Sequence, residues 1–414
     1  MKRSSKNYVY FAFIWHGFFL AITASMLDLN TVFPALITTL TSSRILFGLI
    51  YSVMLSVPLI FNVVFSHYLR RKKHKKIYLL IGIYLRGASF LGMALFTFYF
   101  AKTHPNLTLF SYFIFVFLFS ISAGFAGISY SDIIAKELDS KDRVNLYTIK
   151  QFFGSSGAFL GGLFIAKIFS IDMVYPLNYS VSLFIGFVGL FIASLGFIFL
   201  KEPESVISKE KPVSLLQYIK KIPSVLKKDE SFKYFIIVEN LSGFSIMILP
   251  FYMMFAKESF VLDDSYIGIY LIILTVGTII STLLWGFIAK KFDAKHIVGL
   301  CIILGGLNPI LALILSNTTP ALFGIIFFII GFMRSGRKIG FEPYFLDIIP
   351  LNERVEYLGI RGSLNILRVI LPLVAGILIS YVGYIFTFIL VTVMMTLSFI
   401  ELLKITDKQI EEFC

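Results

Sequence analysis

Long apolar segments separated by short polar ones make up most of this chain. A helix needs about 20 apolar residues to cross the hydrocarbon core of a bilayer. Apolar and polar residues do not alternate strictly, so the segments predict helices rather than barrel strands. The sequence thus predicts an all-α membrane protein with twelve transmembrane helices. The predicted spans are 9–38, 45–66, 77–101, 107–133, 146–168, 177–200, 234–256, 266–289, 296–316, 320–345, 358–380 and 382–403.

One long polar stretch, residues 201–233, interrupts this pattern near the middle and contains eight lysines. It divides the chain into a first six-helix bundle (1–200), a cytoplasmic basic connector (201–233) and a second six-helix bundle (234–414). Within the connector, apolar residues recur at helical spacing and predict a short amphipathic helix: Leu215, Ile219, Ile222 and Leu226. This helix either lies on an anionic membrane surface or is a solvated linker.

Composition supports the membrane assignment. The 414 residues are 57% hydrophobic and 15% charged, with a mean hydropathy of +0.86, whereas soluble domains carry about 25% charged residues. The net charge of +13 comes from short basic runs between spans, which indicates topology and not nucleic-acid binding. Six Lys or Arg lie in 67–76 and three in 290–296, on the same side as the connector. Both termini are therefore predicted to be cytoplasmic, in the inner (plasma) membrane.

The sequence offers no pattern for catalysis. Its two cysteines, Cys301 and Cys414, predict neither a disulfide nor a metal site. There is no phosphate-binding glycine loop followed by Lys-Ser/Thr, so no ATPase motif is present. We therefore expect no enzyme activity, no metal and no cofactor.

The two halves of the sequence resemble each other at matching places. Aspartate, arginine and a second basic residue recur in the same order after the fourth and tenth spans. The residues are Asp132, Arg143 and Lys150 in the first half, and Asp347, Arg354 and Arg361 in the second. This ordered recurrence predicts a duplication and two pseudo-symmetric bundles.

Twelve spans in two halves, a basic central connector and basic loops after spans 2 and 8 together resemble the major facilitator superfamily. The loop motif of that family, G-x-x-x-D-R-x-G-R-R/K, is degraded here. Val63 stands at the glycine and His67 at the acid, and in the second copy Lys290 replaces the acid after Gly286. The resemblance implies transport by alternating access, in which two bundles rock about a central site.

A glycine-rich stretch in the fifth span, residues 157–162, is similar to a motif of proton antiporters in that family, without its proline. The alternative interpretation is a close helix contact through small residues.

Two acids inside spans are candidate proton carriers, because ionisable residues at membrane depth are costly. Asp28 lies in span 1, and Glu239 lies about two turns into span 7. The alternative for Asp28 is a helix-end acid bonded to local backbone. The alternative for Glu239 is a salt bridge to a nearby lysine such as Lys233.

Basic residues in spans 10 and 11 are candidate substrate contacts. Arg334 and Arg337 lie in span 10 beside Lys338, and Asn365 and Arg368 follow in span 11. In the family, these two spans are expected to border the central cavity. Guanidinium groups there favour a substrate with a carboxylate or phosphate group. The alternative is that these side chains extend to the membrane surface.

Four charged residues at predicted cytoplasmic helix ends are interpreted as ion pairs of an inward gate: Asp132, Arg143, Asp347 and Arg354. Surface pairs are individually weak, which suits a gate that opens and closes.

The sequence thus predicts a monomeric secondary active transporter of a small organic solute, anionic or amphipathic, with protons and membrane lipids as its other partners. Export by proton antiport is favoured. The alternatives are a proton-linked importer of a sugar or organic anion, and a receptor or scaffold that does not transport.

Overall fold

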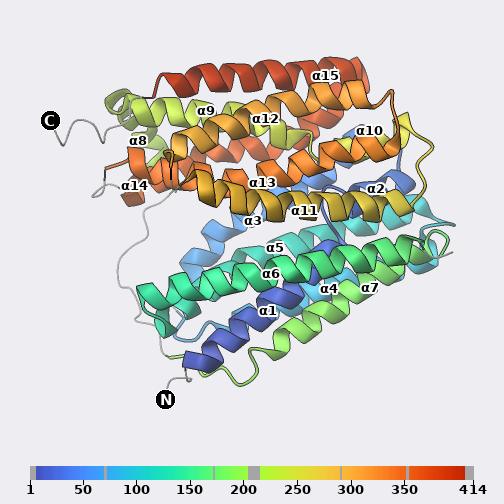
Figure 1. Cartoon of the computed structure of the whole chain (residues 1–414). Coiled ribbons are helices and arrows are strands. Elements are labelled where there is room, and N and C mark those ends of the chain that lie inside the picture. The colour runs from blue at the N-terminus through green and yellow to red at the C-terminus, as the bar shows by residue number, and fades with distance from the viewer. Residues whose placement is uncertain are drawn as a thin grey trace. The chain divides into compact units, whose positions relative to one another are not determined.

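The computed structural model describes residues 6–69, 72–170, 173–203, 215–289, 291–350 and 354–405 (Figure 1). Within these ranges the regular structure is helical. The chain forms two compact units. The first comprises residues 1–211 together with 263–272, and the second comprises 212–262 and 273–414. The division at residues 211 and 212 falls inside the predicted connector.

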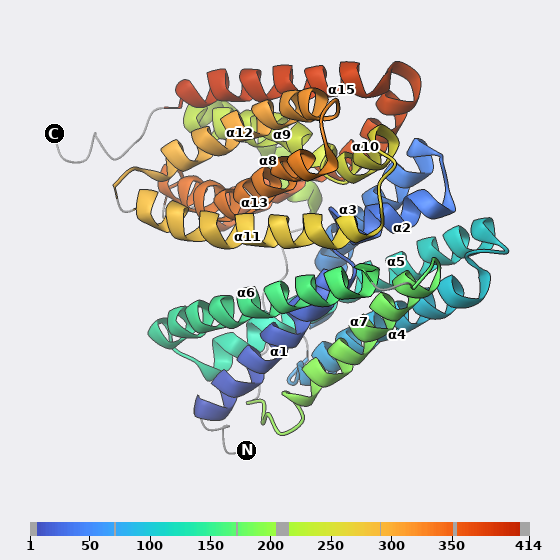
Figure 2. The same cartoon turned by 45° about the vertical axis from the view of Figure 1, so that its right-hand side comes forward.

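The first unit is built from helices α1 to α7. Helix α1 packs against both α6 and α7, α4 packs against α5 and α7, and α3 packs against α5 (Figure 2). The bounds are α1 Lys6–Met26, α2 Val32–Leu40, α3 Arg44–Leu69, α4 Lys76–Phe100, α5 Pro105–Glu137, α6 Ser140–Ser170 and α7 Leu177–Leu195.

The second unit contains the remaining helices. Helix α9 packs against α15, and α12 packs against both α13 and α15. The bounds are α8 Leu215–Lys228, α9 Glu230–Met247, α10 Phe251–Ser259, α11 Ser265–Ile288, α12 Ala294–Leu315, α13 Pro320–Ile348, α14 Arg354–Leu364, the 3₁₀ helix η2 Asn365–Ile370 and α15 Leu371–Leu403. The first residues of α11 belong to the first unit.

The first long helix of each unit, α1 or α9, is followed by a break and a short helix. Between α1 and α2 the Asp28 carboxylate accepts the backbone N–H groups of Asn30 and Thr31, at 2.9 and 3.1 Å. Between α9 and α10 the break is at Pro250, which has no N–H to continue the helical bonding. The predicted spans 9–38 and 234–256 therefore each consist of a long helix and a short one.

A second break lies between α14 and α15, where η2 replaces one and a half turns of α-helix. Pro372 explains it, because proline cannot donate to the carbonyl of Arg368 four residues earlier. The N–H of Leu371 bonds that carbonyl instead, in a 3₁₀ pattern. Further on, α15 turns at Gly383, whose φ of 82° is a left-handed conformation that glycine tolerates.

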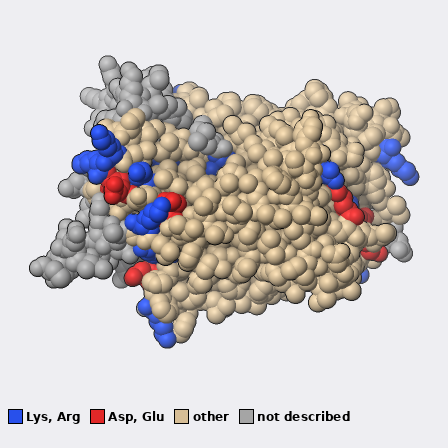
Figure 3. Space-filling model, turned by 90° about the horizontal axis from the view of Figure 1, so that it is seen from above, with Lys and Arg blue, Asp and Glu red and all other residues tan. Residues whose placement is uncertain are grey.

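Ten helical segments of the described chain are long and apolar enough to cross a membrane. Helix α13, which carries Arg334 and Arg337, is not among them, and one of the ten, residues 360–403, contains the turn at Gly383. Figure 3 shows charged side chains towards the two ends of one face, with a broad uncharged stretch between them. The prediction of a multi-pass membrane protein is confirmed, and the number of twelve transmembrane helices stays a prediction.

The predicted amphipathic helix of the connector exists as α8, which packs against α14 and α9. Ile222 and Leu226 are half-buried there, and Lys227 and Lys228 are exposed. The side chains of Leu215 and Ile219 lie outside the described residues, and the lipid contact stays a prediction.

Candidate functional site

Glu239 is the centre of a polar cluster inside the second unit. Helix α9 begins after Asp229, whose carboxylate accepts the N–H of Phe232 at 3.0 Å and caps the helix. Glu239 follows two to three turns later, and its side chain is only 4% exposed. A buried carboxylate needs both a counter-charge and hydrogen bonds, so its partners define the site.

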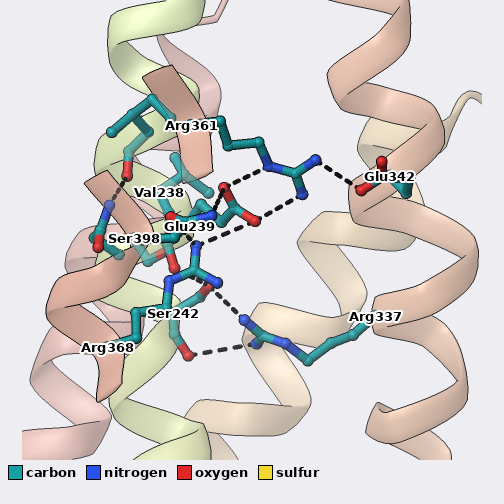
Figure 4. Close-up of polar contacts among 11 residues, drawn as sticks. Val238, Glu239, Ser242, Arg337, Glu342, Arg361, Arg368 and Ser398 are labelled. Carbon is teal, nitrogen blue, oxygen red and sulfur yellow. Dashed lines mark hydrogen bonds and ion pairs between the residues drawn. The ribbon is translucent and has the colours of Figure 1, made fainter. Parts of the chain in front are cut away.

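Arg361 of α14 is the principal partner of Glu239 (Figure 4). Its Nε donates to Glu239 Oε2 at 3.0 Å, and its Nη2 donates to Oε1 at 2.8 Å. The third nitrogen, Nη1, donates to Oε2 of Glu342 on α13 at 2.6 Å. The guanidinium also lies 4.4 Å from the ring centroid of Phe345. This bidentate pair fixes both geometry and charge.

Arg368 and Asn365, both in η2, complete the contacts of Glu239. Asn365 Nδ2 donates to Glu239 Oε2 at 3.2 Å, and Arg368 Nη2 lies 3.1 Å from Oε1. The same Nη2 donates to Asn365 Oδ1 at 2.9 Å. The Arg368 side chain runs past Gly243, where a Cβ would lie 3.3 Å from its Cδ.

Arg337 of α13 approaches α9 one turn beyond Glu239. Its Nη2 donates to Ser242 Oγ at 2.9 Å and its Nη1 to the Ser242 carbonyl at 3.4 Å. The Ser242 hydroxyl in turn donates to the Glu239 carbonyl at 3.0 Å. The guanidinium lies 4.6 Å from the ring centroid of Phe341. Among the described residues, no ion pair joins Arg337 to a carboxylate.

The cluster therefore holds three arginines against two acids, Glu239 and the 55%-exposed Glu342. Its formal excess is one positive charge, and it grows by one more if Glu239 binds a proton. Such an arrangement can exchange a proton and attract an anion.

The sequence predicted several members of this cluster as site residues. The structure brings together Glu239, Asn365, Arg368 and Arg337. The expected alternative for Glu239, a salt bridge to Lys233, is not what is observed, because Arg361 and Arg368 are its ionic partners. Arg334 is an exposed residue of α13.

Two residues of the cluster, Ser242 and Glu342, were not predicted from the sequence. Glu342 offered a signal, because it is an acid inside the predicted span 320–345. Ser242 offered none, because a serine in an apolar helix commonly bonds its own backbone.

Asp28 lies in the first unit and holds the end of its helix. Its Oδ1 accepts from the N–H groups of Asn30 and Thr31 and from the Thr31 hydroxyl, the last at 3.1 Å. This geometry matches the alternative of a helix-end acid bonded to local backbone. Its role as a proton carrier stays a prediction.

The gate residues of the first unit have partners other than each other. Asp132 pairs with Lys75 at 2.5 Å and Lys136 at 2.6 Å. Arg143 instead donates to backbone carbonyls near the end of α5. Lys136 also pairs with buried Glu202 at 2.6 Å, which accepts the N–H of Lys75. The gate role remains untested.

In the second unit, Asp347 is an exposed residue of α13. The side chain of Arg354 lies outside the described residues, so their pairing stays a prediction.

Within the described residues, no group of three or more His, Cys, Asp or Glu is arranged to hold a metal ion. Cys301 is a buried free thiol.

Comparisons with known proteins agree with the architecture. The model of the Major Facilitator Superfamily matches residues 235–412. No curated protein matches the chain.

Solved structures match over nearly the whole length. A structure of the nucleoside transporter NupG has a TM-score of 0.72 at 13% identity, covering 96% of this chain and 100% of that one. A peptide transporter POT in complex with sulfate has a TM-score of 0.70 at 11% identity, covering 96% and 94%. A D-xylose-proton symporter has a TM-score of 0.67 at 17% identity, covering 97% of each chain. The model of that family thus matches the second half of the chain, and the fold of the whole chain is similar to that of these transporters.

Proposed function

We propose that the protein couples the movement of a small organic anion to the movement of a proton in the same direction, with Glu239 as the proton site. The observation that carries this proposal is the buried Glu239 carboxylate between Arg361 and Arg368. An acid in this position can change its charge without any rearrangement of the backbone.

Protonation of Glu239 would remove the negative charge that both arginines now contact. Two further charged groups contact this cluster: Arg337, from α13, and Glu342, which shares Arg361. Charges on the neighbouring helices α12 and α15 are engaged elsewhere. Lys295 donates to the Ile405 carbonyl, and Glu401 pairs with Lys404. A proton on Glu239 therefore leaves uncompensated arginine charge, which an anion would neutralise.

This electrostatic relation supports symport over antiport. If a proton and an anion bind to the same cluster, each favours the other, and both move together. The sequence favoured antiport through the glycine-rich stretch of α6. In the structure a Cβ on Gly157 would lie 2.5 Å from the Phe18 carbonyl oxygen, and one on Gly161 would lie 2.6 Å from Ser25 Cβ. Close packing of α1 against α6 thus accounts for these glycines, and the antiport interpretation loses its main support.

A similar fold in a protein described as a D-xylose-proton symporter is consistent with a proton as the driving ion. The distribution of Lys and Arg supports an inner-membrane location with both termini in the cytoplasm. Uptake of the anion down the proton gradient is then the natural direction.

The test uses the full chain in phosphatidylcholine liposomes that enclose a pH-sensitive dye, with an imposed pH gradient. We expect inward proton flux that depends on an added organic anion, and no such flux with neutral solutes. In Glu239→Gln the anion-dependent proton flux should fall to the background of empty liposomes, while anion exchange without a gradient persists. Glu342→Gln is the matched control, because Glu342 also contacts Arg361 but is 55% exposed. It should keep most of the flux.

Unchanged proton flux in Glu239→Gln would contradict the proton site. Proton release that accompanies anion uptake would contradict symport and favour antiport. Absence of flux with every solute would favour the receptor or scaffold alternative.

A further inference from the structure

We infer that Arg337 and Arg368 form the binding site for a carboxylate or phosphate group of a soluble substrate, on the face of α9 beside Ser242 and within the second unit. The inference rests on the proposed function and names the substrate chemistry of that site. It differs from the sequence-based interpretation, which centred the anion contact on Arg334 and Arg368.

The first observation is that Arg337 makes only neutral contacts. Its two terminal nitrogens donate to the hydroxyl and carbonyl of Ser242, and its plane lies near the Phe341 ring. The residue is half-buried in an apolar helix. A guanidinium in such surroundings is costly without an anionic partner, and none of the described carboxylates pairs with it.

The second observation concerns Arg368. Its Nη2 is used by Glu239 and Asn365. Its Nε is buried and has no hydrogen-bond partner among the described residues. A buried donor without an acceptor loses about 1–3 kcal/mol of hydrogen bonding. The two arginines thus have donor capacity that the protein itself does not satisfy.

The third observation is that both guanidinium groups approach the same short piece of α9. Arg337 contacts Ser242, and Arg368 contacts Glu239 one turn earlier and packs on Gly243 (Figure 4). A Cβ on Gly243 would lie 3.2 Å from Leu371 Cδ1 and 3.3 Å from Arg368 Cδ, so the glycine allows the Arg368 side chain to lie close against α9. Carboxylate and phosphate groups have the oxygens needed to accept from two arginines at once.

The placement also links the anion to the proton. Glu239 is itself a carboxylate held by Arg368, and it would compete with a substrate anion for that guanidinium. Neutralising Glu239 should therefore strengthen anion binding.

The binding test needs no gradient. The full chain in phosphatidylcholine nanodiscs is titrated by calorimetry with inorganic phosphate or succinate, with glycerol as the neutral control. We expect saturable binding of an anion that weakens about 10- to 100-fold in Arg337→Ala and in Arg368→Ala, which is the range for one charged hydrogen-bonding partner. Glu239→Gln should bind more tightly than the natural chain.

Lys338→Ala is the matched control, because it removes a positive charge from the adjacent, exposed residue of α13. It should change affinity less than about twofold, since an exposed charge is well screened. If Arg337→Ala fails to fold, Arg337→Lys keeps the charge without the bidentate fork and should show an intermediate loss.

Equal losses in Lys338→Ala and Arg337→Ala would overturn the inference, because general attraction would then explain binding. Binding of neither anion would also overturn it. Loss of phosphate binding when phosphatidylglycerol is added to the nanodiscs would assign the site to a lipid headgroup instead of a soluble substrate. Anion binding without proton flux in liposomes would support the anion site and contradict the proton coupling. Anion-dependent proton flux without the expected losses of binding in Arg337→Ala and Arg368→Ala would support the coupling and contradict the anion site.

Discussion

The two units carry the same cation–aromatic pair at matching positions. In each, the aromatic residue stands two places before the repeated aspartate, and the cation stands seven places after the repeated arginine. Lys150 Nζ lies 4.8 Å from the ring centroid of Tyr130 in the first unit. Arg361 Cζ lies 4.4 Å from that of Phe345 in the second. A further aromatic ring completes each group. It is His16 of α1 on Tyr130 in the first unit and Phe235 of α9 on Phe345 in the second.

The residues that follow these cations differ sharply. Four and seven places after Lys150 stand Gly154 and Gly157, whereas Asn365 and Arg368 stand four and seven places after Arg361. In the first unit, α6 is one continuous helix and α1 packs closely on Gly157. In the second, the equivalent helix breaks into α14, η2 and α15, and its polar side chains reach Glu239.

The two units therefore use the same arrangement of helices with different interiors. Glycine permits helix contact at backbone distance, so the first unit uses this surface for packing. Asparagine and arginine keep the helices apart and need polar partners, so the second unit has a polar cluster at the same surface. The cation–aromatic pair is common to both units, and the second unit adds the charges on which the proposed function depends.

The largest effect should come from removing the cation of the second unit, Arg361, and Lys150 of the first unit gives the comparison. Arg361→Ala deprives buried Glu239 of its bidentate partner and should destabilise the protein by about 3–5 kcal/mol. Lys150→Ala should lose about 1–2 kcal/mol, because a cation–π contact and one hydrogen bond to Tyr130 are weaker. Thermal unfolding in detergent measures both.

The double variant Arg361→Ala with Glu239→Gln provides the control, since it removes the charge that Arg361 compensates. Most of the lost stability should return. If it does not, packing of Arg361 on Phe345 outweighs its ion pair, and the contrast between the units is weaker than we infer.

The next effect concerns the glycines of α6. Gly157→Ala would bring a Cβ to 2.5 Å from the Phe18 carbonyl oxygen, a backbone atom that cannot easily move. We expect a loss of about 1–3 kcal/mol, typical of overpacking. At Gly154 a Cβ meets nothing within 4 Å, so Gly154→Ala should leave stability equal or slightly higher. Similar melting temperatures for the two variants would show that the first unit does not depend on this close contact.

The smallest effect should come from making the two pairs alike. Tyr130→Phe keeps the ring under Lys150 and removes the hydroxyl that accepts its ammonium at 3.0 Å. The expected loss is about 1 kcal/mol, the net value of one such hydrogen bond. Tyr130→Leu, which also removes the ring, should lose more. Equal losses of stability in the two variants would mean that the Tyr130 ring contributes nothing to stability. Tyr130 and Phe345 would then match in sequence position but not in their interaction with the cation.

Much of the architecture followed from the sequence. Apolar length alone predicted membrane helices, because a bilayer imposes a fixed thickness and internal hydrogen bonding. The breaks within spans were harder to predict. Pro34, Pro250 and Pro372 are visible in the sequence, but whether proline bends, breaks or starts a helix depends on which nearby groups satisfy the freed carbonyls.

The sequence predicted most of the residues of the candidate site, but not which of them form ion pairs or hydrogen bonds with each other. Glu239, Arg337, Asn365 and Arg368 were recognisable because charged and amide residues are rare at membrane depth. The spacing of these residues did not predict their contacts. In the structure, Arg361 pairs with Glu239 and Arg337 donates to Ser242, whereas Arg334 is exposed. For Asp132, spacing suggested an ion pair, and the structure supplied two lysines as its partners.

The sequence by itself determined that the chain is a helical membrane protein with a repeated half, because hydrophobic length and repeated motifs are properties read along one dimension. Only the tertiary structure decided which charges meet. Ion pairing depends on separations of a few ångströms between helices that are more than 100 residues apart in the chain, as with Glu239 and Arg361. The same fact separates Lys150 from Arg361: the two cations match in sequence, but Lys150 lies on the Tyr130 ring, whereas Arg361 is bonded to the buried Glu239 carboxylate.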